Sequence, residues 1–228
     1  MKKWSRSLIF VILGFLIAFL GIWLFNDQRY NLVIILLVII SCLLFYFKYE
    51  SSHPKTREVV ILALMVALTV IGRSLFIMFP SFKPVCALVI ITGMVFGKQD
   101  GFMCGSLSAL ISDFIFGIGP WTPFQMLAWG SIGYIAGVLR IVLNKNKYLL
   151  YLYALLAGIG FSMFMDLWSV LTIENSFNIY RYLTTIIAAL PVTIVYMISN
   201  VVFIFLLKEP MVKIMQRVKI KYGILEGD

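Results

Sequence analysis

The feature that most constrains this chain is an apolar stretch, long enough to cross a bilayer, that recurs eight times between short polar connectors. A helix needs ~20 apolar residues to span ~30 Å of hydrocarbon. Hydrophobic residues make up 62% of the chain and its mean hydropathy is +1.00, more apolar surface than a soluble core can hide. The sequence therefore predicts an all-α integral membrane protein with spans at residues 8–25, 30–47, 58–78, 84–97, 101–116, 122–143, 148–171 and 183–207.

The basic residues predict how these spans are oriented. Most of the 19 Lys and Arg residues fall at the two ends of the chain and in alternate connectors, whereas the remaining connectors hold few. By the positive-inside rule, both termini are expected in the cytoplasm of a multi-pass cell membrane protein. The net charge of +9 is thus explained by topology and by a basic tail beside anionic lipid, without nucleic acid as a partner.

A polar linker at residues 51–57 predicts how the chain is divided. A pair of helices at 1–50 precedes it, a six-helix module at 58–207 follows it, and a basic tail at 208–228 ends the chain. The single histidine, His53, falls in the linker, and the three cysteines lack metal-ligand spacing. The sequence therefore predicts no catalytic group, no metal and no cofactor.

Three ionisable residues lie inside predicted spans of the module: Arg73, Asp113 and Asp166. The predicted topology puts all three near the outer surface, and a charge facing lipid there is costly, so each should face the bundle interior or a water-filled cavity. One interpretation is an ion pair that only locks helices together. The favoured one is a polar pocket, because two carboxylates face one guanidinium, and Ser162 and Ser169 share the helical face of Asp166.

The connector sequence GIGPWTPFQM, which begins at Gly117, predicts a second part of such a pocket. Its glycines and prolines favour a rigid turn, from which Trp121, Gln125 and Trp129 can point inward. An interfacial aromatic belt is the alternative for Trp121. Aromatic surface beside fixed polar groups is typical of a site for a flat or ring-containing small molecule.

Small residues predict where helices touch. Gly101, Gly105, Ser108 and Ser112 form one stripe, and Gly93/Gly97 and Gly133/Gly137 are similar pairs, expected to pack within the module. Ala63 and Ala67 form another pair that faces about 100° away from Arg73. This face is expected to meet a second protein.

On these residues the chain resembles the substrate-binding S components of energy-coupling factor (ECF) vitamin transporters. The resemblance covers residues 57–207 and rests on the six-helix size, the AxxxA pair and the block from Gly93 through GPWTPFQM to Gly137. It implies that a micronutrient binds near the outer face, and that Ala63 and Ala67 dock on a transmembrane coupling subunit driven by two ATPases. The outer connectors at 79–84, 117–123 and 172–182 would line or cover the site. The leading helix pair departs from the six-helix pattern.

The GPWTP block most resembles members associated with cobalamin or corrinoid precursors, so a corrinoid is the expected ligand. Folate, pantothenate and riboflavin are alternatives. A membrane enzyme or scaffold acting on lipids or isoprenoids is the alternative of another class.

Overall fold

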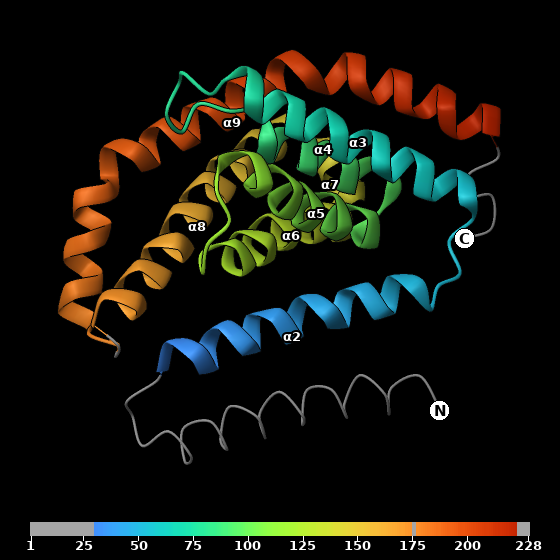
Figure 1. Cartoon of the computed structure of the whole chain (residues 1–228). Helices are drawn as coiled ribbons and strands as arrows, with labels where there is room; N and C mark the ends of the chain where they lie inside the picture. The colour runs from blue at the N-terminus through green and yellow to red at the C-terminus, as the bar shows by residue number, and fades with distance from the viewer. Residues whose placement is uncertain (1–29, 175–176, 223–228) are drawn as a thin grey trace.

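The computed structural model describes residues 30–174 and 177–222, which fold into an all-α structure (Figure 1). The predicted span at 8–25 lies outside the described residues. The helices are α2 (Tyr30–Glu50), α3 (Thr56–Leu75), α4 (Val85–Phe96), α5 (Lys98–Phe116), α6 (Thr122–Val138), α7 (Arg140–Lys145), α8 (Lys147–Glu174) and α9 (Ile179–Tyr222).

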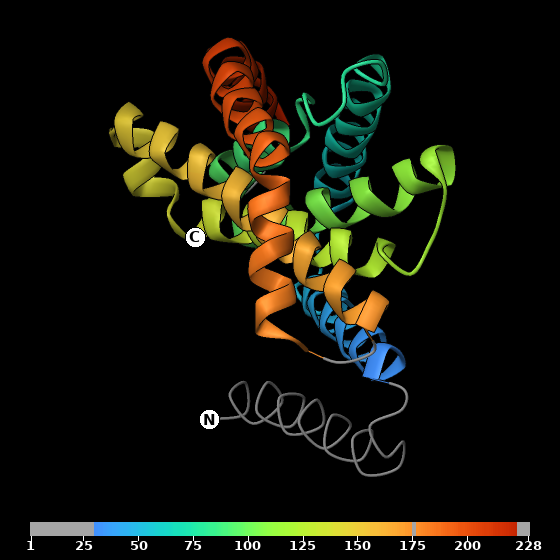
Figure 2. The same cartoon turned by 90° about the vertical axis from the view of Figure 1, so that its left-hand side faces the viewer.

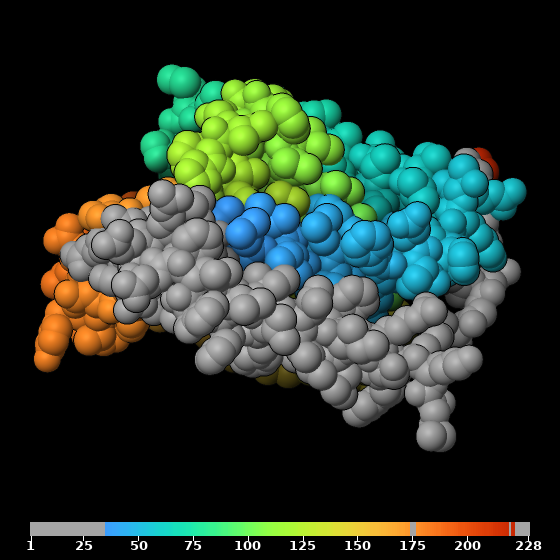
Figure 3. Space-filling view, turned by 60° about the horizontal axis from the view of Figure 1, so that its bottom comes forward, coloured from blue at the N-terminus to red at the C-terminus, as the bar shows by residue number. Residues whose placement is uncertain are grey.

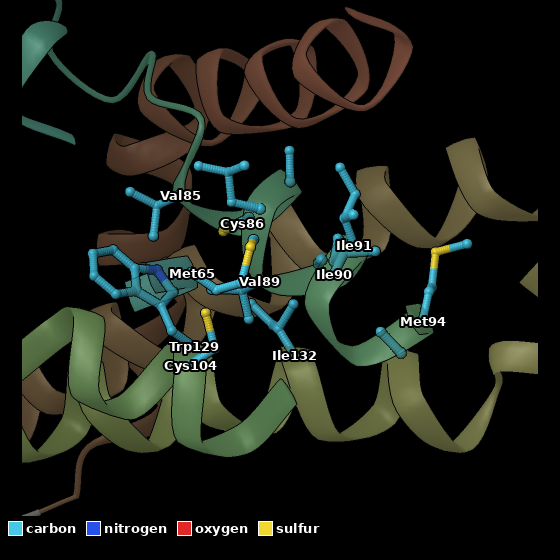
Figure 4. Close-up of a cluster of buried hydrophobic side chains, with 14 of the residues drawn as sticks. Met65, Val85, Cys86, Val89, Ile90, Ile91, Met94, Cys104, Trp129 and Ile132 are labelled. Carbon is cyan, nitrogen blue, oxygen red and sulfur yellow. The ribbon is translucent and has the colours of Figure 1, made fainter. Parts of the chain in front are cut away.

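Three of the described helices are long and apolar enough to cross a membrane, at Thr56–Leu75, Lys147–Ile173 and Ile179–Val218. Helix α4 is apolar but has only 12 residues, which cover about 18 Å at 1.5 Å per residue. It forms the centre of the module instead, because all of its residues except Val95 are buried. Figure 4 shows its side chains packed with those of neighbouring helices, including Met65 and Trp129.

Glycines allow the central helices to approach closely. A Cβ atom added to Gly133 of α6 would lie 2.1 Å from the carbonyl oxygen of Gly101 on α5, and one added to Gly93 of α4 would lie 2.2 Å from the carbonyl oxygen of Gly133. No side chain fits at these crossings, so the backbones themselves are in contact. The expectation that these small residues pack within the module is confirmed.

Helix α2 packs against the module. The ring of Phe45 stacks on Phe102 of α5 with 3.9 Å between centroids, and it meets Tyr134 of α6 edge-on at 5.3 Å. The hydroxyl groups of Tyr46 and Ser106 lie 3.0 Å apart. Figure 3 shows α2, in blue, along the green helices. The second predicted span is therefore joined to α5 and α6 by specific contacts.

The connectors gather at two opposite ends of the molecule. The α3–α4 and α5–α6 connectors lie at one end with the close of α8 and the start of α9 (Figures 1 and 2). The α2–α3 linker and the last turns of α9 lie at the other. For these segments, the two ends agree with the alternation expected from the sequence.

Two predicted helices have different bounds in the structure. The helix expected at 122–143 is two helices that meet at Leu139, because the chain turns there to bury Leu143 against α4 and α8. The helix expected at 183–207 begins at Ile179, where the side chain of Asn178 accepts hydrogen bonds from the backbone N–H groups of residues 180 and 181. It continues to Tyr222 because Met215 packs into the core, so much of the expected tail is helical.

Candidate functional site

An ion pair between α3 and α5 is the centre of the candidate site. The Nη1 atom of Arg73 lies 2.8 Å from Oδ1 of Asp113 and also donates to the hydroxyl of Ser112. The two side chains of the pair are only 12% and 1% exposed. Both residues lie near the ends of their helices, at the end of the module that carries the α3–α4 and α5–α6 connectors.

The carboxylate of Asp113 also binds the start of α6. The Thr122 hydroxyl donates to Oδ2 at 2.7 Å, and the Gln125 amide, with its nitrogen turned toward the carboxylate, lies 3.0 Å from both oxygens. Gly117 permits this return of the chain, since its φ of 108° is open to glycine and rarely to other residues. Asp113 therefore holds α3, α5 and α6 together and has its acceptor positions filled.

A row of aromatic rings runs beside the ion pair. The guanidinium carbon of Arg73 lies 4.5 Å from the ring centre of Phe116 and 5.0 Å from that of Trp129. Trp129 stacks on Phe161 at 5.5 Å and 18°, and Phe161 meets Tyr196 edge-on at 5.1 Å. The row thus draws on α5, α6, α8 and α9. Trp129 is 5% exposed, and its indole N–H has no hydrogen-bond partner in the described part of the chain.

The α3–α4 connector adds a second cation to this end of the molecule. The ammonium of Lys83 lies 5.0 Å from the centre of the Phe116 ring. The backbone of Lys83 is held by α9, because the hydroxyl of Ser199 donates to the Lys83 carbonyl at 3.0 Å and accepts from the Lys83 N–H at 2.9 Å. Burial, and then the charge of Arg73, lower the pKa of Lys83.

The predicted residues of α8 do not join the ion pair. Asp166 makes no ion pair within the described ranges, and its buried Oδ2 has no hydrogen-bond partner there. Helix α8 packs mainly along α9, which leaves Asp166 outside hydrogen-bonding distance of Arg73. The Ser162 hydroxyl lies 2.7 Å from that of Thr193 on α9, and Ser169 donates to the Met165 carbonyl of its own helix at 3.1 Å. The expected meeting of three ionisable groups is therefore reduced to one pair.

Trp121 belongs to a second aromatic group at the same end of the molecule. Its ring meets that of Trp168 on α8 edge-on at 6.0 Å. Phe124 of α6 contacts both Trp168 and Phe164 at 6.4 and 5.7 Å. Because Trp121 is 37% exposed, it lies at the rim of the site, while Gln125 and Trp129 lie inside.

Phe116, Phe161, Trp168 and Tyr196 were not among the site residues predicted from the sequence, whereas Lys83 falls in the connector at 79–84 that was expected to line or cover the site. Phe116 carried a usable signal, since it lies one helical turn beyond Asp113 and so shares its face. No sequence signal distinguished Phe161 and Tyr196, because aromatic residues are frequent along the predicted spans. Their positions depend on which helices are neighbours.

Ala63 and Ala67 lie on the outside of α3. Both are exposed, and so is Leu64 between them at 56%, whereas Met65 and Val66 are buried in the module. The helix thus presents one apolar face away from the core and directs Arg73 toward α5.

Together, the ion pair and the aromatic rings place flat apolar side chains beside hydrogen-bond donors at one end of the module, with Trp129 and Phe161 buried in its core. A comparison with protein-family models matches residues 53–217 to the ECF-type riboflavin transporter, S component. Searches of curated proteins and of solved structures gave no significant match. The matched range begins in the α2–α3 linker and includes every helix from α3 to the greater part of α9. The chain therefore belongs to the ECF-type riboflavin transporter S component family, and is a component of a membrane transporter rather than an enzyme.

Proposed function

We propose that this protein is the substrate-binding subunit of an ECF importer, and that it binds a flavin, with riboflavin as the first candidate. The observation that carries the proposal is the family match over residues 53–217, whose description names a riboflavin transporter. The match also favours transport over the alternative of an enzyme or scaffold acting on lipids or isoprenoids.

The geometry of the candidate site supports a flat ligand. The rings of Trp129 and Phe161, which are 5% and 4% exposed, stack on each other with Arg73 against Trp129, so a flat ligand would enter this aromatic layer by displacing one of its neighbours. The unpartnered indole N–H of Trp129 is a donor for a ring carbonyl. An isoalloxazine ring combines a planar apolar body with carbonyl acceptors, which fits these groups.

A corrinoid remains the second candidate. The block GPWTPFQM, which resembles the cobalamin-associated members, contributes Thr122 and Gln125 to the Asp113 network and Trp121 to the rim. Folate and pantothenate are further alternatives, because both carry carboxylates that Arg73 or Lys83 would attract.

Transport is proposed to require a transmembrane coupling subunit and two cytoplasmic ATPases. The exposed face of α3 around Ala63 and Ala67 is the proposed contact with the coupling subunit. Two small residues one turn apart let a second helix approach closely, and Val60 and Leu64 add exposed apolar surface beside them.

Binding is tested with purified protein in detergent, by titrating riboflavin, cobalamin, folate, pantothenate and thiamine. Riboflavin fluorescence should be quenched as its ring stacks on tryptophan. Trp129→Ala should weaken binding by about 2 kcal/mol, roughly thirtyfold, because it removes the aromatic plane. Trp129→Phe keeps a ring but lacks the N–H donor, so about 1 kcal/mol should be lost.

Phe205→Ala is the matched control, because this ring on α9 is 68% exposed and makes no ring contact with the described residues. It should leave the affinity unchanged. If cobalamin binds and riboflavin does not, the ligand is a corrinoid and the flavin assignment is wrong. If none of the five vitamins binds, the vitamin-binding proposal fails.

Coupling is tested with Ala63→Leu/Ala67→Leu. The double variant should lose uptake and association with the coupling subunit but keep ligand binding, because both changes lie on the exposed face of α3. Ala188→Leu, which adds the same bulk to an exposed position of α9, should leave uptake unchanged. Loss of binding together with uptake would show that the pair acts within the module instead.

A further inference from the structure

We propose that Lys83, together with the edge of the Arg73 guanidinium that is not bound to Asp113, forms a subsite for an anionic group of the transported molecule, a phosphate or a carboxylate. The inference rests on the proposed role of this region as the substrate-binding site. It adds to that role the charge of the preferred ligand.

Two positive charges lie around the ring of Phe116. Arg73 and Lys83 lie 4.5 and 5.0 Å from the centre of the same ring, so the two cations are less than ~10 Å apart, about one Debye length at 0.1 M salt. Within the described ranges, Asp113 pairs with Arg73, and no carboxylate lies within 4.0 Å of the Lys83 ammonium. This region therefore has an excess of one positive charge over its ion-paired carboxylate.

Both cations keep hydrogen-bond donors that the described residues do not use. Arg73 makes its hydrogen bonds to Ser112 and Asp113 through Nη1 alone, which leaves Nη2 and Nε without a bond to the described residues. The Lys83 ammonium likewise makes no hydrogen bond in the described part of the chain, although its backbone is held on both sides by Ser199. Two neighbouring cations with unused donors can hold a phosphate or carboxylate by charge-assisted hydrogen bonds.

The Lys83 ammonium, unlike the ion-paired Arg73, is not placed where it stabilises the fold. Half-burial beside another positive charge disfavours the ammonium form, and the pKa of Lys83 is accordingly lowered. Asp113 cannot serve Lys83 as well, because Arg73, Thr122 and Gln125 already occupy its oxygens. An anionic group of the ligand would supply the missing negative charge.

The test compares riboflavin with flavin mononucleotide, which differ by one phosphate. Full-length wild type and Lys83→Met are titrated with each, following flavin fluorescence. Wild type should bind the mononucleotide at least as tightly as riboflavin. Lys83→Met keeps an unbranched stem but no charge, and should weaken mononucleotide binding about tenfold and riboflavin binding about twofold at most.

Two further variants separate charge from structure. Lys83→Arg keeps the charge and should retain most of the affinity for the mononucleotide. Lys213→Met removes an exposed lysine from the other end of the molecule and should change neither affinity. Rising salt should weaken mononucleotide binding and leave riboflavin binding nearly constant.

Equal weakening of both flavins by Lys83→Met, or a wild type that binds riboflavin but rejects the mononucleotide, would overturn the subsite and leave the flavin proposal standing. If neither flavin binds, the flavin proposal fails and the subsite is tested with folate, pantothenate and inorganic phosphate. A rise in unfolding temperature that disappears in Lys83→Met supports it. No such rise with any of the three overturns it.

Discussion

Replacing Asp113 by asparagine should show how much the buried ion pair contributes to the stability of the fold. The substitution nearly keeps the shape of the side chain but removes the charge that faces Arg73. Asparagine keeps only one acceptor oxygen. Its amide N–H₂ group, which is a donor, therefore faces the donors of Arg73 or Gln125. The Arg73 guanidinium is then left with two aromatic rings and the Ser112 hydroxyl as its neighbours.

The magnitude follows from the burial of the pair. Removing one partner of a buried ion pair costs about 3–5 kcal/mol, because the other charge remains desolvated. Arg73 keeps 12% exposure and cation–π contacts, so we expect the lower end, about 3 kcal/mol. For a chain of this length that corresponds to a fall in unfolding temperature of roughly 6 to 12 °C.

The assay is thermal unfolding in detergent, followed by tryptophan fluorescence. It compares the single variants Asp113→Asn and Arg73→Met with the double variant Arg73→Met/Asp113→Asn. The double variant removes both charges, so most of the lost stability should return, with a coupling energy of about 2 kcal/mol. A single Asp113→Asn variant as stable as wild type, or single effects that simply add in the double variant, would refute a stabilising buried pair.

Three other predictions follow from the packing, the charge and the topology. Gly133→Ala should destabilise the fold by about 2 kcal/mol, because its Cβ would meet backbone atoms of α5, whereas Gly160→Ala, with open space around it, should be neutral or slightly stabilising in the same unfolding assay. Because the pKa of Lys83 is lowered in the folded protein, the unfolded chain keeps this proton to higher pH. The stability of ligand-free wild type should therefore rise with pH above the folded pKa and level off near 10.5. The Lys83→Met variant should lack this rise. An impermeant thiol reagent added outside cells should label Ile118→Cys and not Lys145→Cys, and the opposite pattern would invert the predicted orientation.

The apolar stretches alone determined that this chain is a bundle of membrane helices, because a hydrocarbon solvent forces each segment to satisfy its own backbone hydrogen bonds. The glycine pairs predicted the close helix crossings, because small residues that recur every turn leave a smooth face for a neighbouring helix. The interior position of Arg73 and Asp113 also followed from sequence, because a charge at that depth is costly in lipid.

Only the tertiary structure decided which carboxylate pairs with Arg73. Asp113 and Asp166 are equivalent by depth and helical period, but α5 packs along α3 whereas α8 packs mainly along α9. Periodicity gives the inward face of a helix and not the neighbour that it meets. Tertiary packing likewise brought Phe161 into line with Trp129 and ended α6 at Val138, since both depend on surfaces that distant parts of the chain supply.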